Sequence, residues 1–185
     1  LLRLKIATYG GIVLAMPIWL FQIWRFVTPG LNPREKRFAV PFIVLGGFFV
    51  FFFRDPNRNV VDRPDAVVSP ADGRVMVAGP AEASAAPPGS WQQISIFLSP
   101  MDVHVNRMPV SGRVTRVLYT PGRFLPAYRA EAATANERSE IWIDHNGTFV
   151  VARQIVGILA RRVVCRAKVG DVVQAGDRYG VMKFG

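Results

Sequence analysis

Two long apolar runs open the chain and constrain its fold more than any other feature. The first covers residues 6–24, and the second covers residues 38–53. At about 19 and 16 residues, they lie close to, and just below, the roughly 20 residues that a helix needs to cross a bilayer core. A basic, turn-rich connector at residues 28–37 separates them. We therefore expect residues 1–53 to form a hydrophobic helical hairpin that anchors the chain to a membrane.

The sequence allows two depths for this hairpin: it could span the membrane, or it could lie shallowly within a single leaflet. The ends and the connector are both basic, so the positive-inside rule does not choose between them. Pro17 and Pro41 weaken straight helices, which favours the shallow arrangement. A signal peptide is not expected, because no small-residue cleavage site follows the first run.

The charge of the chain predicts an acidic partner surface. Its formal net charge is +10 and its pI is near 10.8. The arginines are scattered without any zinc-finger, helix-turn-helix or RNA-binding signature, so we expect no nucleic-acid partner. Anionic membrane lipid fits the apolar N-terminus better, and the cytoplasmic face of the cell membrane is the expected location. The single cysteine, Cys165, lies in an apolar run and is expected to be a buried small hydrophobe.

Beyond residue 53 the pattern changes to short strands, and residues 54–185 are predicted to form a β-rich catalytic domain. Asn146-Gly147 between two strand-like runs predicts a hairpin. Residues 169–177 resemble the glycine turn of barrel-sandwich domains such as biotinyl and lipoyl carriers. An alanine-rich stretch at 126–138 predicts a helix. The expected fold is mainly β, a small barrel-sandwich-like domain. Strands are predicted at residues 73–79, 94–98, 113–119, 140–144 and 148–153.

The acid–base residues are few, with His104 and His145 the only histidines. His145 adjoins the Asn-Gly turn and is expected to be exposed. His104 follows Asp102 by two positions on an extended segment, so both side chains are predicted to lie on one face. A carboxylate beside an imidazole suits a general acid or base, although an ordinary polar surface explains the pair equally well. Asp72, directly before a glycine, is typical of a turn. No cluster has metal-ligand spacing, so no metal is expected.

An ordered set of short motifs is more specific than any of these features. The motifs are Phe-Phe-Arg-Asp-Pro at 52–56, Ser-Pro-Ala-Asp-Gly at 69–73, Leu-Ser-Pro-Met-Asp-Val-His at 98–104, Met-Pro-Val-Ser-Gly at 108–112, Asn-Glu-Arg at 136–138 and Lys-Phe-Gly at 183–185. With these motifs in this order, the sequence resembles the short bacterial and archaeal phosphatidylserine decarboxylases over essentially the whole chain.

The resemblance implies a precursor that continues past Gly185 with a serine and cleaves itself there. The larger β subunit then ends in the glycine, as this chain is expected to do, and the small α subunit begins with a covalent pyruvoyl group. The implied reaction converts phosphatidylserine to phosphatidylethanolamine and carbon dioxide through a Schiff base. The implied partners are the α subunit and phosphatidylserine, and a homo-oligomer of β/α pairs is expected.

The resemblance also suggests roles for individual residues. His104, oriented by Asp72 or Asp102, is the expected base in self-cleavage and proton donor in turnover. Many long-form relatives carry a second histidine where this chain has Arg107. Arg107 or Arg138 could bind the substrate's carboxylate or phosphate, although an ordinary surface arginine is equally consistent. A biotinyl or lipoyl carrier-like domain, or an inactive membrane-anchored β domain, is the alternative.

Overall fold

The computed structural model describes residues 2–27, 30, 33–60, 63, 66–81, 86–129 and 131–185. The chain divides into two compact units, Leu1–Phe49 and Val50–Gly185. Residues 28, 29, 31 and 32 of the predicted connector lie outside the described residues.

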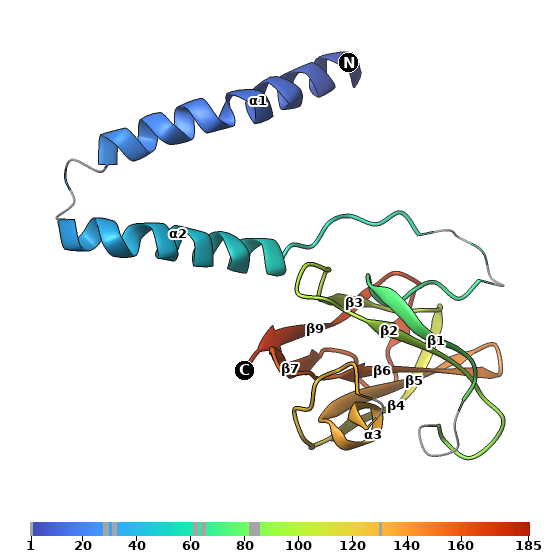
Figure 1. The fold of residues 1–185 in the computed structure, drawn as a ribbon. Coiled ribbons are helices and arrows are strands. Elements are labelled where there is room, and N and C mark those ends of the chain that lie inside the picture. Colours follow the sequence, from blue (N-terminus) through green and yellow to red (C-terminus); the bar gives the residue numbers. More distant parts are fainter. Residues whose placement is uncertain are drawn as a thin grey trace. The chain divides into compact units, whose positions relative to one another are not determined.

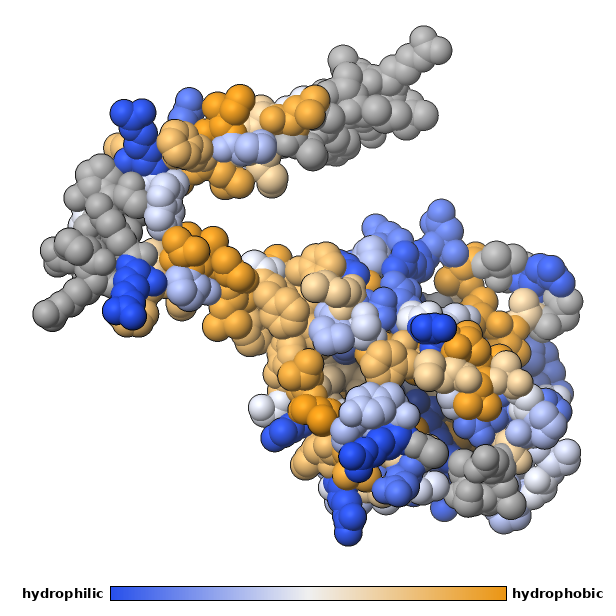
Figure 2. All heavy atoms as spheres, viewed as in Figure 1, coloured by the Kyte–Doolittle hydropathy of each residue, from blue (hydrophilic) through white to orange (hydrophobic). Residues whose placement is uncertain are grey.

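The N-terminal unit is helical, as predicted. Helix α1 covers Leu2–Val27, and helix α2 covers Pro33–Phe52, so the last turn of α2 belongs to the second unit (Figure 1). Pro17 and Pro41 lie inside these helices without ending them. Apolar side chains dominate the described surface of both helices (Figure 2). Over the described residues, neither helix combines the length and the apolar character that crossing a membrane requires.

The second unit is mainly β, which confirms the predicted fold class. Its described residues form a two-stranded sheet in the order β1-β2, a three-stranded sheet in the order β3-β9-β7 and a four-stranded sheet in the order β6-β5-β4-β8 (Figure 1). The strands are β1 (Arg74–Pro80), β2 (Gln92–Phe97), β3 (Val105–Arg107), β4 (Gly112–Thr120), β5 (Arg138–His145), β6 (Thr148–Ile155), β7 (Ala160–Cys165), β8 (Val172–Val173) and β9 (Arg178–Phe184).

The hairpin between β5 and β6 forms where the sequence predicts it. Asn146 and Gly147 adopt φ angles of 53° and 86°, the left-handed conformation that a tight hairpin turn requires. The Asp144 carboxylate accepts a hydrogen bond from the Gly147 N–H at 2.8 Å and closes the turn. The strands then pair in register from His145 and Thr148 outward.

The core of this unit lies among the inward faces of β4, β5 and β6 and the segments that cover them. Ile141 and Ile143 alternate along β5 and are fully buried, as period-two spacing predicts. Cys165 is half-buried and packs against this core, in line with its expected role. The buried cluster comprises Met108, Val110, Val114, Ile141, Ile143, Ala152, Val173 and Tyr179.

The predicted helix at 126–138 is wrong over most of its length. Only a single turn, α3 (Ala132–Ala135), is helical, and residue 130 lies outside the described residues. The buried Asn136 side chain explains the difference, because its amide bonds the backbone of Leu125 and Val156. These tertiary hydrogen bonds hold residues 123–129 as a loop, overriding the helix propensity of the alanines.

Candidate active site

His104 lies directly before β3, beside the last strand of the chain. Its backbone carbonyl accepts a hydrogen bond from the Met182 N–H of β9 at 3.0 Å. The side chain is buried, with 4% of the residue exposed. Its Nδ1 lies 2.9 Å from the Asp102 carbonyl oxygen, which can only accept, so Nδ1 carries the proton and donates. Nε2 then holds the lone pair, and no described residue forms a hydrogen bond to it.

The surroundings of His104 favour its neutral form. Burial lowers the pKa of the imidazole below its ordinary value, and the nearby Arg54 guanidinium lowers it further. The carbonyl and the carboxylate of Asp102 act in the opposite direction without reversing the shift. A neutral ring with a free Nε2 is the form that accepts a proton as a general base.

The Phe-Arg-Asp-Pro motif forms a strap around His104, which we define as residues 52–56. The Phe52 ring stacks on the imidazole with centroids 3.9 Å apart and also contacts the Phe184 ring at 4.1 Å. Phe52 is 1% exposed. Arg54 donates from Nη2 to the Met101 carbonyl at 2.6 Å, in the turn that leads to His104. The strap therefore links His104 to the strand that ends next to Gly185.

Asp55 and Arg107 anchor the other end of the strap. Arg107 donates from Nη2 to Asp55 Oδ1 at 2.7 Å and from Nη1 to the Gly176 carbonyl at 3.1 Å. The second carboxylate oxygen of Asp55 lies 2.6 Å from Arg178 Nε. With its side chain only 16% exposed, Arg107 serves in this structure to hold the strap.

The two predicted carboxylates have different surroundings. The Asp102 carboxylate accepts a hydrogen bond from the Ser99 N–H at 2.7 Å, so its backbone carbonyl, and not its side chain, orients His104. Asp72 forms an ion pair with Arg58, and both side chains are partly exposed. Among the described residues, the structure brings Asp102 to His104 and shows no contact between Asp72 and His104.

The remaining predicted residues lie at separate positions. Arg138 begins β5 and donates from Nη1 to the Thr134 carbonyl at 2.7 Å. Gly185 follows β9, where a side-chain carbon would come within 2.7 Å of Arg161 Cβ, so a larger residue does not fit without a shift. His145 is half-buried and bonded to the Ser111 carbonyl, so the prediction of an exposed side chain was wrong.

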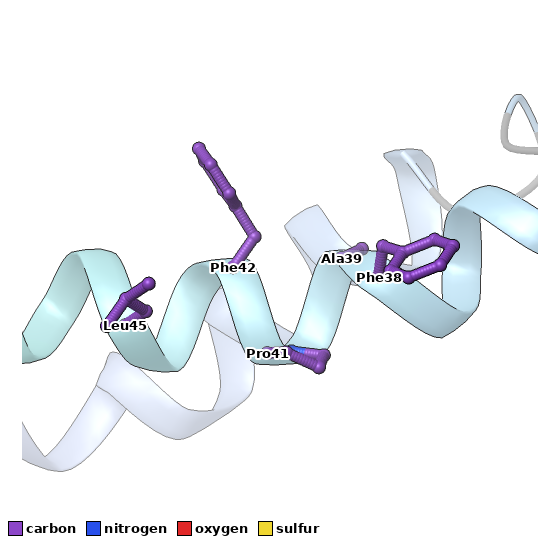
Figure 3. Close-up of a pocket in the computed structure, with 5 residues that line it drawn as sticks. All are labelled: Phe38, Ala39, Pro41, Phe42 and Leu45. Atoms are coloured by element: carbon purple, nitrogen blue, oxygen red, sulfur yellow. The ribbon is translucent and has the colours of Figure 1, made fainter.

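Two hollows lie elsewhere in the chain. One, of about 540 Å³, is lined by apolar residues of α2, among which Phe42 and Pro41 project from opposite sides of the helix (Figure 3). The other, of about 380 Å³, is polar and lies beside Arg107, Asp177 and Tyr179. Neither is lined by His104. Among the described residues, no three carboxylate, imidazole or thiol groups gather as a metal site.

Sequence reasoning missed Phe52, Phe184 and Asp55 as parts of the site. The Phe-Arg-Asp-Pro motif was visible as a family marker, but its spacing carries no sign of a ring stacked on a histidine 52 positions later. The only sequence signal that could have placed this motif at the site is its occurrence together with the His104 segment in one chain.

Two family models match parts of this chain. The phosphatidylserine decarboxylase family model matches residues 45–185, and the model of the Sec-independent protein translocase protein TatC matches residues 1–54. The TatC match covers less than half of the chain and does not set its family.

Three relatives, each called phosphatidylserine decarboxylase proenzyme, share much of the sequence. The Chlorobium phaeobacteroides protein is 42% identical over 86% of this chain and 73% of its own length. The Solibacter usitatus protein is 43% identical over 80% of this chain and 69% of its own length. The Chlorobium chlorochromatii protein is 46% identical over 80% and 68%. These matches decide against the carrier-like alternative, and the chain belongs to the phosphatidylserine decarboxylase family.

Proposed function

We propose that this chain is the β subunit of a pyruvoyl-dependent enzyme that converts phosphatidylserine to phosphatidylethanolamine and carbon dioxide. The names of its relatives support the substrate and a precursor form. One observation carries the proposal: a buried histidine, whose lowered pKa favours the neutral ring and whose Nε2 bonds none of the described residues, lies beside β9, the strand that leads to Gly185.

His104 is the proposed base for self-cleavage after Gly185. A serine hydroxyl is a weak nucleophile at neutral pH and needs a base to accept its proton. Nε2 takes this proton as the hydroxyl oxygen bonds to the Gly185 carbonyl carbon, and the amide nitrogen is protonated as the ester forms. The Asp102 carbonyl keeps the ring in the tautomer that this step requires.

The same residue is the proposed proton donor in turnover. A pyruvoyl group on the partner α subunit, when bound, supplies a carbonyl that accepts the electron pair released with carbon dioxide. His104 fits beside such a group because its low pKa makes the protonated ring a stronger acid. In each turnover Nε2 takes up a proton from water and delivers it to the α-carbon of the lipid. The Phe52 ring stacks on one face of this imidazole.

The N-terminal helices are the proposed membrane anchor, at the cytoplasmic face of the cell membrane. Exposed apolar side chains such as Leu14, Phe26 and Phe42 support this location. The overall charge of +10 suits anionic lipid headgroups. Assembly of β/α pairs into a homo-oligomer is part of the same proposal.

The test uses the precursor with a serine after Gly185. We expect it to yield two chains whose masses place the cut after Gly185, and to release carbon dioxide from phosphatidylserine. His104→Ala leaves an uncut chain or a cut but inactive one, whereas the control His145→Ala, on the hairpin, behaves as the parent. Normal cutting and normal decarboxylation by His104→Ala would refute the proposal.

A second measurement locates the electrophile. Cyanoborohydride reduction in the presence of phosphatidylserine is expected to attach the lipid to the small partner chain. Lipid found on the chain that contains His104, or biotin or lipoate found on Lys183, would overturn the assignment of the pyruvoyl group to the partner.

A further inference from the structure

A loop and a turn lie side by side next to Gly185. The loop covers residues 123–129, and the turn covers residues 157–159 with the first two residues of β7. A side-chain carbon placed on Gly157 would contact Ala127 Cβ at 3.5 Å. The Arg161 guanidinium lies 5.7 Å from the centre of the Phe124 ring, and the same arginine packs on Gly185. These contacts make one continuous surface that reaches Gly185.

Large apolar side chains on this surface are exposed. Phe124 is 41% exposed, Tyr128 72%, Ile158 47% and Leu159 54%. These four residues define what we call the apolar ridge. These exposures show that the aromatic residues of the loop are not packed in the core.

The apolar ridge is held in place by a buried amide. Asn136 is fully buried, and its Oδ1 accepts from the Leu125 N–H at 2.9 Å. Its Nδ2 donates to the carbonyls of Leu125 and Val156 at 2.9 and 2.8 Å. One side chain thus fixes both the loop and the residue before the turn. Because the loop is already held in place, the apolar ridge loses little conformational entropy when a partner binds.

The charges around the apolar ridge select its partner. Arg123, Arg129 and Arg161 are exposed in the two segments, with Glu131 beside them. Aromatic residues mixed with arginines are typical of surfaces that lie at the headgroup level of an anionic bilayer. A protein partner of ordinary composition would leave these positive charges without acidic groups, so charge complementarity favours lipid.

We propose that the apolar ridge docks the β domain onto an anionic bilayer next to Gly185. The lipid headgroup then reaches the site while its acyl chains stay in the membrane. Delivery of the headgroup to the site rests on the proposed function, whereas the contact between the apolar ridge and the lipid does not. The domain thereby meets the bilayer through its own surface, in addition to any contact made by the helices.

The test measures the depth of a nitroxide spin label in the full chain, reconstituted in vesicles of equal parts phosphatidylcholine and phosphatidylglycerol. Cys165→Ser removes the native thiol, and Leu159→Cys carries the label. The matched control is Val172→Cys, at an exposed valine of β8. Val172 pairs with Arg113 at the start of β4, whereas the loop follows the other end of that strand. Both labelled positions are exposed, so neither substitution disturbs the core.

We expect the label at 159 to collide several-fold more with oxygen, which enters lipid, than with a water-soluble nickel chelate. The label at 172 shows the reverse. Equal access of nickel to both positions would overturn the proposal, and so would shielding of position 159 from both agents, which marks contact with protein such as a second copy. Equal lipid contact in vesicles of phosphatidylcholine alone would overturn the requirement for anionic lipid.

Decarboxylation of phosphatidylserine, added to the same vesicles and measured on the unlabelled enzyme together with its α subunit, separates the two proposals. Lipid contact without decarboxylation leaves docking standing and removes the proposed function. Decarboxylation without lipid contact at position 159 does the opposite.

Discussion

The Phe52 ring covers one face of the His104 imidazole, with 3.9 Å between the ring centroids and 26° between the planes. The aromatic ring replaces water that would otherwise stabilise the charged imidazolium. Burial is the largest cause of the lowered pKa of His104, so Phe52 contributes directly to the protonation state of the proposed base.

Replacement of Phe52 by a smaller residue should raise the pKa of His104. In Phe52→Leu, water reaches the imidazole and the pKa moves toward its ordinary value of about 6.5. Phe52→Ala should also lower the free energy of unfolding by about 3–5 kcal/mol, the cost typical of a large core deletion. NMR titration of the His104 ring measures the pKa. Phe149→Leu, which changes an exposed ring on β6, should leave the His104 pKa unchanged. If the His104 pKa is the same in Phe52→Leu and in the parent, Phe52 does not lower the pKa of His104.

The lowered pKa of His104 predicts a pH dependence of stability. The unfolded chain keeps the ordinary value near 6.5, so on acidification it takes up the proton before the folded chain does. The stabilising contribution is complete above about pH 6.5 and is lost as the pH falls toward the lowered folded value. Urea unfolding should therefore show a steeper loss of stability below that pH in the parent than in His104→Gln. Parallel curves for the parent and His104→Gln would contradict the assignment.

Loss of the Arg107–Asp55 contact should loosen the strap. Arg107→Met leaves the half-buried Asp55 carboxylate with Arg178 as its remaining partner among the described residues, and should cost about 1–3 kcal/mol of unfolding free energy. Arg58→Met, which breaks an exposed ion pair, should cost at most about 1 kcal/mol. Denaturant unfolding compares the two. Equal small losses would show that Arg107 is an ordinary surface arginine.

A methyl group at Gly185 should impede self-cleavage of the precursor. Gly185→Ala brings a carbon within 2.7 Å of Arg161 Cβ, so the strand end must shift by some tenths of an ångström. The expected result is slower appearance of the two chains on a denaturing gel. Adding Arg161→Gly, which removes the opposing Cβ, should restore part of the rate. No recovery in the double variant would place the effect of Gly185→Ala elsewhere.

The sequence predicted β1, β2, β4, β5 and β6 and missed β3, β7, β8 and β9. β5 and β6 follow from alternation and the Asn-Gly turn. β9 was missed because Gly180 interrupts it, and the structure shows why a glycine is needed: a side-chain carbon there would lie 2.5 Å from the Gln154 amide nitrogen. β7 was missed because its side chains do not alternate: Arg161 and Arg162 are followed by the apolar run 163–165.

The site was predictable in its central residue and not in its surroundings. His104 stood out because histidines are scarce and Asp102 lies two positions away. Spacing alone suggested that the Asp102 carboxylate orients the ring, but a local turn directs that carboxylate to the Ser99 N–H and leaves the backbone carbonyl for His104. Contacts of the strap span about 50 positions, a separation over which periodicity carries no information.

The position of Phe52 sets a limit on how the enzyme can be shortened for crystallisation. Residues 1–53 form a hydrophobic segment, and cutting after residue 53 is the obvious way to remove it. Such a fragment would lose the Phe52 ring that covers His104, and water would reach the imidazole. A fragment that begins at Val50, the first residue of the second unit, keeps this ring and the whole strap.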